Sequence, residues 1–336
     1  MKLRPESLKK YVLDKFKSND SSVVLQADVG IDAAAVKTCD EFLVGVHPDP
    51  ISGAVKYLGT LSIIIPANDV AMIGAYPKFF TSVILLPEGS SEDLVDMITN
   101  SMKKALDRYR ASMIGGHTEF TDSVKRPITI TTAFGILKSS NLVDIRNIKE
   151  GDLIIMSKYA GIEGTAVLSS DFRETLIAKG VSEKTLNVGE EMINLVSVVE
   201  EATLLSREGL VSGMHDPTEG GILGGLAEMA YASGKLIRVY ADKILLHEVT
   251  IEITKALGLD PLRILSSGAL LASVPKERVE EAVSLLKKSN IEVSVIGEVL
   301  PRKHEGPLLE VLKENSKEYV YDPYVEDEVM KLWSMK

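Results

Sequence analysis

The sequence of 336 residues contains one cysteine, Cys39, and one tryptophan. A lone cysteine excludes an internal disulfide framework and any metal site built from several cysteines. It also favours a reducing compartment, so we expect a cytoplasmic protein. Aromatic residues make up only 5% of the chain while hydrophobic residues reach 45%. The core is therefore expected to consist mostly of aliphatic side chains and alanine.

Long apolar runs are also missing. The most apolar stretch, residues 58–75, is interrupted by Pro66, Asn68 and Asp69 and makes a poor membrane span. Residues 1–18 are charged throughout and do not resemble a signal peptide. The chain has 38 basic and 48 acidic residues and a net charge of −10. We therefore expect neither a membrane nor a nucleic acid as partner.

Familiar nucleotide and metal motifs are absent. The sequence contains no P-loop pattern, no G-x-G-x-x-G after a predicted strand and no H-E-x-x-H. Its five histidines are too scattered to indicate a zinc site from spacing.

Strand-like and helix-like segments alternate, which predicts a mixed α+β protein. A polar, turn-rich stretch at residues 148–152 divides it into predicted domains 1–150 and 151–336. A hairpin-like turn is predicted at Cys39 and Asp40. Predicted helices begin after Pro5 and cover 53–74 (interrupted or kinked at Pro66), 94–109, 161–169, 188–207, 218–233 and 278–288. Predicted strands cover 23–26, 42–46, 81–86, 112–114 (leading into a Gly115-Gly116 turn), 128–134, 153–156, 270–274 and 293–297.

The segment Met-His-Asp-Pro-Thr-Glu-Gly-Gly at residues 214–221 has the pattern of a helix start. Asp216 is predicted to cap the helix, Pro217 suits its first position and Glu219 stands three residues past the cap. The glycines that follow allow close approach to the backbone. Free N–H groups at such a helix start suit an anion such as phosphate.

Four acidic residues of the first half stand out. Asp32, Asp49 and Glu119 lie at the ends of predicted strands, and Asp69 lies inside an apolar helix. Each alone has an ordinary explanation as a turn, surface or capping residue. A carboxylate buried among apolar neighbours is nevertheless costly unless it is paired or bound to a metal. Carboxylates that converge with substrate phosphates are the usual ligands of Mg²⁺.

Five motifs, in this order, resemble those of the aminoimidazole ribonucleotide (AIR) synthase superfamily. They are Gly-x-Asp-Ala-Ala, a strand-end Asp-Pro, Asn-Asp-x-Ala-x-x-Gly-Ala-x-Pro, Gly-Gly-x-Thr and Asp-Pro-Thr-x-Gly-Gly. In this chain they occur at residues 30–34, 49–50, 68–77, 115–118 and 216–221. The last motif and residues 266–271 resemble the HypE-like branch, which takes part in hydrogenase maturation.

The resemblance implies a PurM-like two-domain fold. N-terminal domains would pair into an intersubunit β-barrel of a homodimer, and the C-terminal domain would be an α/β sandwich. ATP and Mg²⁺ would bind at that interface. The enzyme would phosphorylate a small acceptor at an amide or carboxylate oxygen, and a partner protein carrying the acceptor group is a further expectation.

The resemblance also implies site residues. Asp32, Asp49 and Asp69 would bind the metal ion, with Glu119 as a possible addition. Asp69, His215 and Asp216 would be catalytic. The nucleotide would contact Gly30, Asp32, Asp49, Asn68, Gly115, Gly116, His117, Thr218, Gly220 and Gly221.

Three departures from the family pattern leave alternatives open. Ile31 stands where many relatives have a second aspartate, and His117 stands where an aspartate is common. HypE proteins end in a cysteine, whereas this sequence ends in Trp-Ser-Met-Lys. A non-catalytic nucleotide-binding partner protein and a thiamine-monophosphate kinase are therefore kept as alternatives. The sequence does not name the acceptor.

Overall fold

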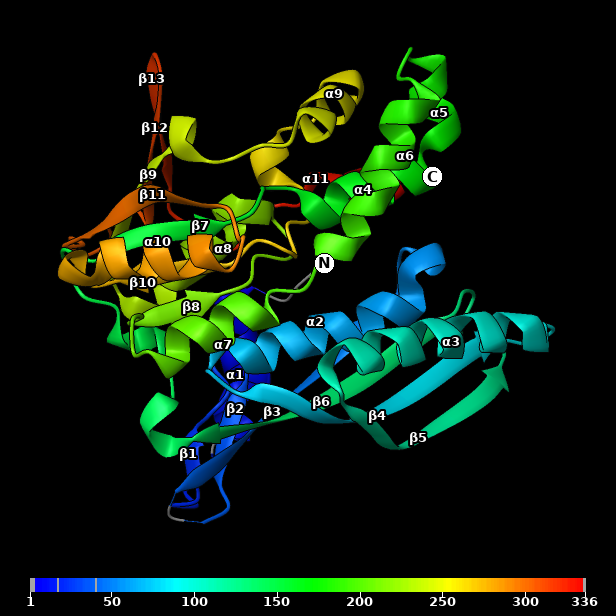
Figure 1. Cartoon of the computed structure of the whole chain (residues 1–336), viewed down its shortest axis with the longest axis horizontal. Coiled ribbons are helices and arrows are strands. Elements are labelled where there is room, and N and C mark those ends of the chain that lie inside the picture. Colours follow the sequence, from blue (N-terminus) through cyan, green and yellow to red (C-terminus); the bar gives the residue numbers. More distant parts are fainter. Residues whose placement is uncertain (1–3, 17, 40, 335–336) are drawn as a thin grey trace.

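The computed structural model describes residues 4–16, 18–39 and 41–334 and places them in two layered units, each built around one β-sheet (Figure 1). Strands of the first sheet all precede residue 139, and those of the second all follow residue 152. The mixed α+β class predicted from the alternating pattern is confirmed. The boundary itself, drawn at residue 150, stays a prediction.

The first sheet has the strand order β1-β2-β3-β6-β4-β5, and neighbours run antiparallel except for β4 and β5. Helices α2 and α3 lie on one side of it, and the opposite side of β4, β5 and β6 carries no helix in the described chain (Figure 1). The strands are β1 (Val23–Leu25), β2 (Ala34–Lys37), β3 (Phe42–Ile51), β4 (Tyr76–Pro87), β5 (Ser112–Thr121) and β6 (Ile128–Lys138). The helices of this half are α1 (Pro5–Tyr11), α2 (Leu58–Met72) and α3 (Glu92–Tyr109).

Helix α2 is buried along almost its whole length, which explains why it has no polar face. It continues through Pro66, so the predicted interruption is absent. Gly59 lets α2 approach α3 closely, because a Cβ there would lie 2.1 Å from the Ile98 carbonyl oxygen. This tight packing holds Asp69, which is 7% exposed, in the molecular interior.

The second sheet has the order β13-β12-β9-β11-β7-β10-β8, with only β12 and β9 parallel. Alternate residues of β7 enter two different cores: Ile154 and Met156 pack with α8, and Ile155 packs in the core that includes α7 and α10. Because both faces are covered, β7 is apolar from Leu153 to Met156. The strands are β7 (Leu153–Ser157), β8 (Gly213–His215), β9 (Leu236–Tyr240), β10 (Leu271–Val274), β11 (Val293–Leu300), β12 (Leu309–Lys313) and β13 (Ser316–Val320).

The helices of the second half differ from prediction in two ways: α5, α9 and α11 were not predicted, and one predicted helix is broken. The single helix predicted over 188–207 is divided into α6, a 3₁₀ turn and α7. Asn68 of α2 explains the break, because it accepts from the Val198 N–H and donates to the Val196 carbonyl, both over 3.0 Å. The helices are α4 (Ile162–Asp171), α5 (Arg173–Ala178), α6 (Glu183–Glu191), α7 (Val199–Arg207), α8 (Gly221–Ser233), α9 (Glu248–Leu257), α10 (Val279–Lys288) and α11 (Glu328–Ser334).

One of the two predicted turns needs correction. Strand β5 continues through Gly115 and Gly116, where a turn was predicted, with an irregular pairing to β4 just before Gly115. It pairs there with β4 so closely that a Cβ on Gly116 would lie 2.3 Å from the Ser82 carbonyl oxygen. The hairpin-like turn predicted near Cys39 is present and joins β2 to β3, although the short alanine-rich strand β2 was not predicted. Asp40 lies outside the described residues.

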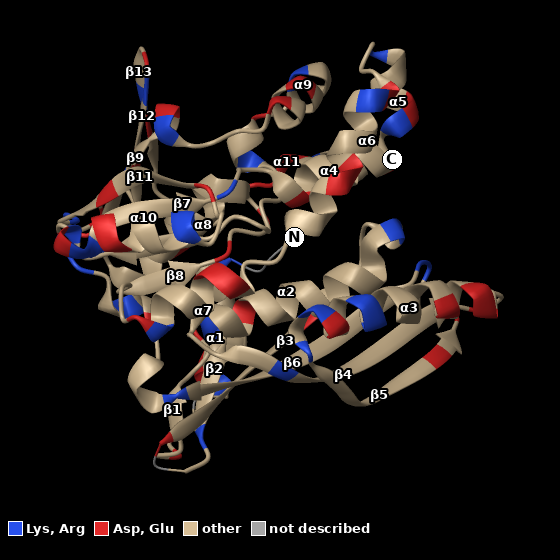
Figure 2. Cartoon of the chain, in the orientation of Figure 1, with Lys and Arg blue, Asp and Glu red and all other residues tan. Residues whose placement is uncertain are grey.

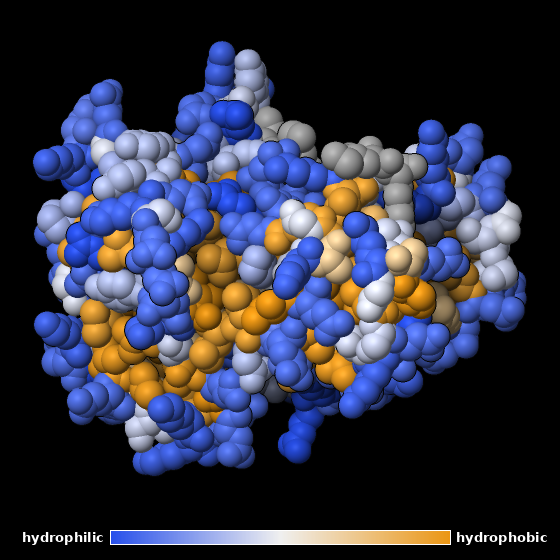
Figure 3. All heavy atoms as spheres, turned by 90° about the horizontal axis from the view of Figure 1, so that it is seen from above, coloured by the Kyte–Doolittle hydropathy of each residue, from blue (hydrophilic) through white to orange (hydrophobic). Residues whose placement is uncertain are grey.

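The surface varies in polarity. Charged side chains lie on α3 and α10, whereas β4, β5 and β6 carry few (Figure 2). Seen from above, apolar residues reach the surface in areas bordered by hydrophilic ones (Figure 3). Within the described ranges, no helix has the length and apolar character needed to cross a membrane.

Candidate functional site

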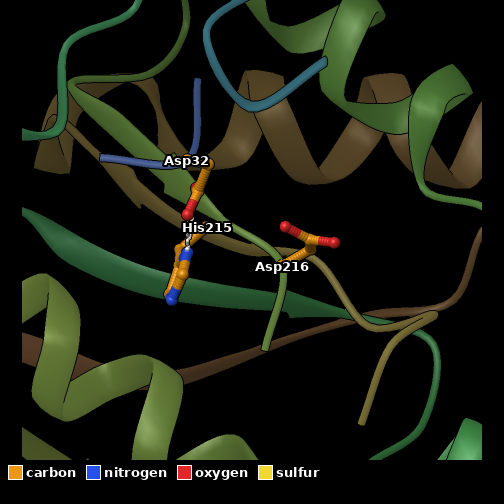
Figure 4. Close-up of side chains that lie close together, drawn as sticks. All are labelled: Asp32, His215 and Asp216. Atoms are coloured by element: carbon orange, nitrogen blue, oxygen red, sulfur yellow. Dashed lines mark hydrogen bonds and ion pairs between the residues drawn. The ribbon is translucent and has the colours of Figure 1, made fainter. Parts of the chain in front are cut away.

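Asp32 lies in the loop between β1 and β2, and Gly30 holds this loop against α8. Gly30 has a φ of 78°, and a Cβ there would lie 2.9 Å from the Glu228 carbonyl oxygen. The loop brings Asp32 to His215 at the end of β8 (Figure 4). His215 Nδ1 lies 2.7 Å from Asp32 Oδ1, and its Nε2 lies 2.9 Å from Glu228 Oε2.

His215 is thus held between two carboxylates. Burial opposes its charged form, but Asp32 and Glu228 outweigh burial and raise the pKa of His215 well above its usual value. A protonated imidazole that donates from both nitrogens has no lone pair left for a metal ion. The geometry therefore gives His215 the role of orienting Asp32.

Asp216 is the most unusual acid of the site. It is 1% exposed, and its carboxylate points away from His215 (Figure 4). Neither oxygen makes a hydrogen bond to another described residue. Burial, followed by the charge of Asp32, raises the pKa of Asp216 well above its usual range. A buried acid without a hydrogen-bond partner is costly, so this carboxylate fits a bound cation.

Asp216 does not have the capping role that its sequence context predicts. Helix α8 begins at Gly221, and Gly220, with a φ of 82°, is its N-cap. The Gly220 N–H donates to Asp327 Oδ2 over 3.0 Å, and the Gly221 N–H donates to the Thr218 carbonyl over 3.2 Å. Both groups expected to meet an anion are therefore engaged within the protein. A phosphate would have to displace Asp327, whose burial raises its pKa to about 6.

A second group of side chains comes from β3 and α2. His47 Nε2 lies 3.6 Å from Asp69 Oδ2 and 4.0 Å from Asp49 Oδ2. One ligand atom from each residue lies within 4.8 Å of the others, so a single ion can reach all three.

One cavity of about 410 Å³ brings the two groups together. Of the four acids expected to converge, Asp32, Asp49 and Asp69 line it and Glu119 does not, and the second half adds Asp216 and Thr218. Among the described residues that line this cavity there is no lysine or arginine. We call it the carboxylate cavity.

Other predicted site residues lie elsewhere. Asn68 is committed to the backbone between α6 and α7. Gly115, Gly116, His117 and Glu119 lie along β5, which is an exposed edge strand. His117 Nε2 and Glu119 Oε2 are 3.1 Å apart, and neither residue lines the carboxylate cavity of its own chain.

Sequence reasoning missed several residues. His47 stands two positions before Asp49 on one strand, so both face the same way, and this spacing was a usable signal. Glu163 is an acid among apolar neighbours of α4, as Asp69 is in α2. Glu228 and Asp327 gave no local signal, because each is defined by contacts with distant segments.

Glu163 belongs to a second cavity, of about 310 Å³, which shares Asp49 and Thr218 with the first. The Ser267 hydroxyl donates to its carboxyl group. Glu163 is 8% exposed, and burial raises the pKa of its carboxyl from 4.5 to about 7.

The raised pKa of the Glu163 carboxyl leads us to expect that the protein loses stability as the pH rises. Because its pKa is raised by folding, stability falls as the pH rises from about 4.5 through about 7, by about 3 kcal/mol in total. Glu163→Gln keeps an acceptor for Ser267 and removes this titration. Thermal unfolding from pH 4.5 to 8 should show the variant gaining stability over wild type as the pH rises. Parallel curves for the two proteins would contradict the assignment.

Both halves of the chain are similar in sequence to known proteins. Models of the N-terminal and C-terminal domains of AIR synthase related proteins match residues 18–137 and 149–310. A putative hydrogenase expression/formation protein of Methanocaldococcus jannaschii is 29% identical, over 76% of this chain and 73% of that protein. Carbamoyl dehydratase HypE of Azotobacter vinelandii is 27% identical, over 74% and 71%.

Solved structures agree in fold. HypE in a complex with HypF superimposes with a TM-score of 0.73 at 22% identity, covering 94% of this chain and 99% of that one. HypE bound to ATP gives 0.72 at 20% identity, covering 94% and 93%. These likenesses confirm the predicted two-domain PurM-like architecture of the chain.

Proposed function

Since the chain belongs to the AIR synthase related family, we propose that it is an ATP- and Mg²⁺-dependent enzyme of the HypE-like type. It phosphorylates a small acceptor at an amide or carboxylate oxygen. The naming of relatives as carbamoyl dehydratases supports an enzymatic role, and the ATP complex of HypE supports the nucleotide.

The observation that carries the proposal is the carboxylate cavity. Five aspartates from both halves of the chain line it: Asp28, Asp32, Asp49, Asp69 and Asp216. Asp216 is buried without a hydrogen-bond partner among the described residues, as expected of a ligand to a hard cation. A triphosphate could not approach five aspartates with no lysine or arginine in the described lining unless a cation intervened. These residues therefore fit Mg²⁺.

The chain's own residues would position the reactants. Asp49 and Asp69 would hold a cation from the first half, Asp216 would offer a carboxylate from the second half beside Asp32, and His215 keeps Asp32 oriented. Bound Mg²⁺ supplies neutralisation of the phosphate charge, on which phosphoryl transfer mainly depends. In the transfer, an acceptor oxygen bonds to the γ-phosphorus. The bond from that phosphorus to the β–γ bridging oxygen breaks, and ADP leaves.

The proposal includes a homodimer formed through the uncovered face and edge of the first sheet. Ile114 on β5 is 61% exposed, Phe120 is 46% exposed, and Ile136 on β6 is 42% exposed. Exposed apolar residues along an edge strand favour pairing with another chain. In such a dimer, the β5 residues His117 and Glu119 would reach a nucleotide only in the second copy's site. The HypE–HypF complex supports a further protein partner that delivers the acceptor.

Calorimetric titration with a non-hydrolysable ATP analogue, with and without Mg²⁺, tests the proposal. We expect Mg²⁺-dependent binding near one site per chain. The absence of binding in both conditions would show that the changes at Ile31 and His117 have disabled the site. Binding without turnover of any acceptor, thiamine monophosphate included, would favour a non-catalytic partner protein.

A further inference from the structure

The second cavity, which we call the Glu163 cavity, lies beside the carboxylate cavity. Asp49 and Thr218 line both, so a molecule in one cavity is adjacent to a molecule in the other. Both polar and apolar side chains line the Glu163 cavity. Its apolar lining includes Ile51, Leu61, Ile65, Leu265 and Trp333.

The charge in this cavity has one sign. Its acids are Asp49, Glu163 and Glu219, and no lysine or arginine occurs among the described residues that line it. The charges that act on Glu163 come from Asp327, Asp49 and Glu219, all acidic. An anionic group would be repelled there, whereas a cationic group would be attracted.

Only one oxygen of the Glu163 carboxyl accepts a hydrogen bond from a described residue. Ser267 donates to Oε2, and Oε1 makes no hydrogen bond to a described residue. The Ser267 oxygen keeps lone pairs that can accept from a bound N–H. A carboxyl and a hydroxyl oxygen side by side, next to an apolar wall, suit an alkylammonium or amidinium group with a short apolar body.

We propose that the Glu163 cavity binds the acceptor and selects a small organic cation, whose nitrogen is held by Glu163 and Ser267. Its apolar body lies against Leu265 and Trp333, and its other end faces Asp49 and Thr218. This inference rests on the proposed function for the acceptor's fate, but the binding itself does not require nucleotide.

Trp333 offers a local readout, because it is the chain's one tryptophan and lines this cavity. Its ring packs over Gly53, where a Cβ would lie 2.9 Å away, and its Nε1 donates to Asp171 over 3.1 Å. A ligand in the cavity would change its fluorescence. The probes are butylammonium chloride, butanamide and sodium butyrate at equal ionic strength, added to the full chain without nucleotide.

We expect the fluorescence emission of Trp333 to change saturably as butylammonium is added. Butanamide and butyrate should cause no change over the same range of concentration. Glu163→Gln should weaken butylammonium binding at least tenfold, and Ser267→Ala should weaken it to a smaller extent. Asp152→Asn is the matched control, because Asp152 is a buried acid that accepts from a serine, Ser273, outside this cavity. It should leave the affinity unchanged.

Two results would overturn the inference: no saturable response to butylammonium, or equal responses to all three probes. Equal loss in Glu163→Gln and Asp152→Asn would also overturn it. The separate titration with Mg²⁺ and the ATP analogue keeps the two proposals distinguishable. Butylammonium binding without nucleotide binding would leave the cation site and remove the phosphoryl-transfer function, and the reverse would remove only the cation site.

Discussion

Asp69→Ala should lower the affinity for the ATP analogue in the presence of Mg²⁺ by at least about 100-fold, which corresponds to about 3 kcal/mol. Asp69 lies inside α2, 7% exposed, within one ion's reach of Asp49 and His47. Removing it takes away a ligand that no neighbouring side chain can replace without moving a buried helix. Calorimetric titration of wild type and variant checks the value.

The control for this substitution is Asp242→Ala, because Asp242 is an exposed acid paired only with the exposed Lys243. It should leave binding unchanged. The thermal midpoint of Asp69→Ala, measured without metal, should change little, because removing one of several clustered acids relieves the repulsion between them. Unchanged affinity in Asp69→Ala would refute the assignment of the carboxylate cavity to Mg²⁺ and ATP.

Ile114→Asp should convert the proposed homodimer into monomers at micromolar concentration. Ile114 lies on the edge strand β5 and is 61% exposed in the single chain. In a dimer its side chain would be covered, and a buried unpaired carboxylate there would cost several kcal/mol. Sedimentation velocity of both proteins measures the result.

Ile251→Asp provides a comparison with the same chemical change. Ile251 lies on α9 and is 47% exposed, far in the sequence from the first sheet. It should remain dimeric. If Ile114→Asp sediments as wild type does, the dimer forms through another face, and His117 and Glu119 lose their proposed route to a nucleotide.

The sequence predicted elements best where their signals are local. Helix α3 ends at Tyr109, as its apolar spacing predicted, and Ser91 caps its start by accepting from the Leu94 N–H. The burial of Asp69 followed from its apolar neighbours. Strand ends and one buried helix also indicated that Asp32, Asp49 and Asp69 would meet, but the same reasoning wrongly included Glu119, which lies on exposed β5.

Other features depend on segments far apart in the chain. The Gly115-Gly116 pair has the composition of a turn, yet pairing with β4 makes it strand. Asp216 has the sequence of a cap, yet Asp327, more than a hundred residues later, binds the Gly220 N–H and leaves Asp216 facing the cavity. No window of local sequence contains these partners, so their effects could not be predicted.

Asn68 and Asp69 are neighbours in the sequence but have different roles in the structure. The Asn68 amide must donate to one carbonyl and accept from one N–H, and it does both for the backbone that divides α6 from α7. Neither a carboxylate nor an aliphatic side chain of that size can do both. In the Asn-Asp motif, the asparagine therefore holds the backbone between α6 and α7, and the aspartate supplies a charge to the carboxylate cavity. Loss of function at the first position would report a displaced segment of backbone rather than a lost contact with nucleotide.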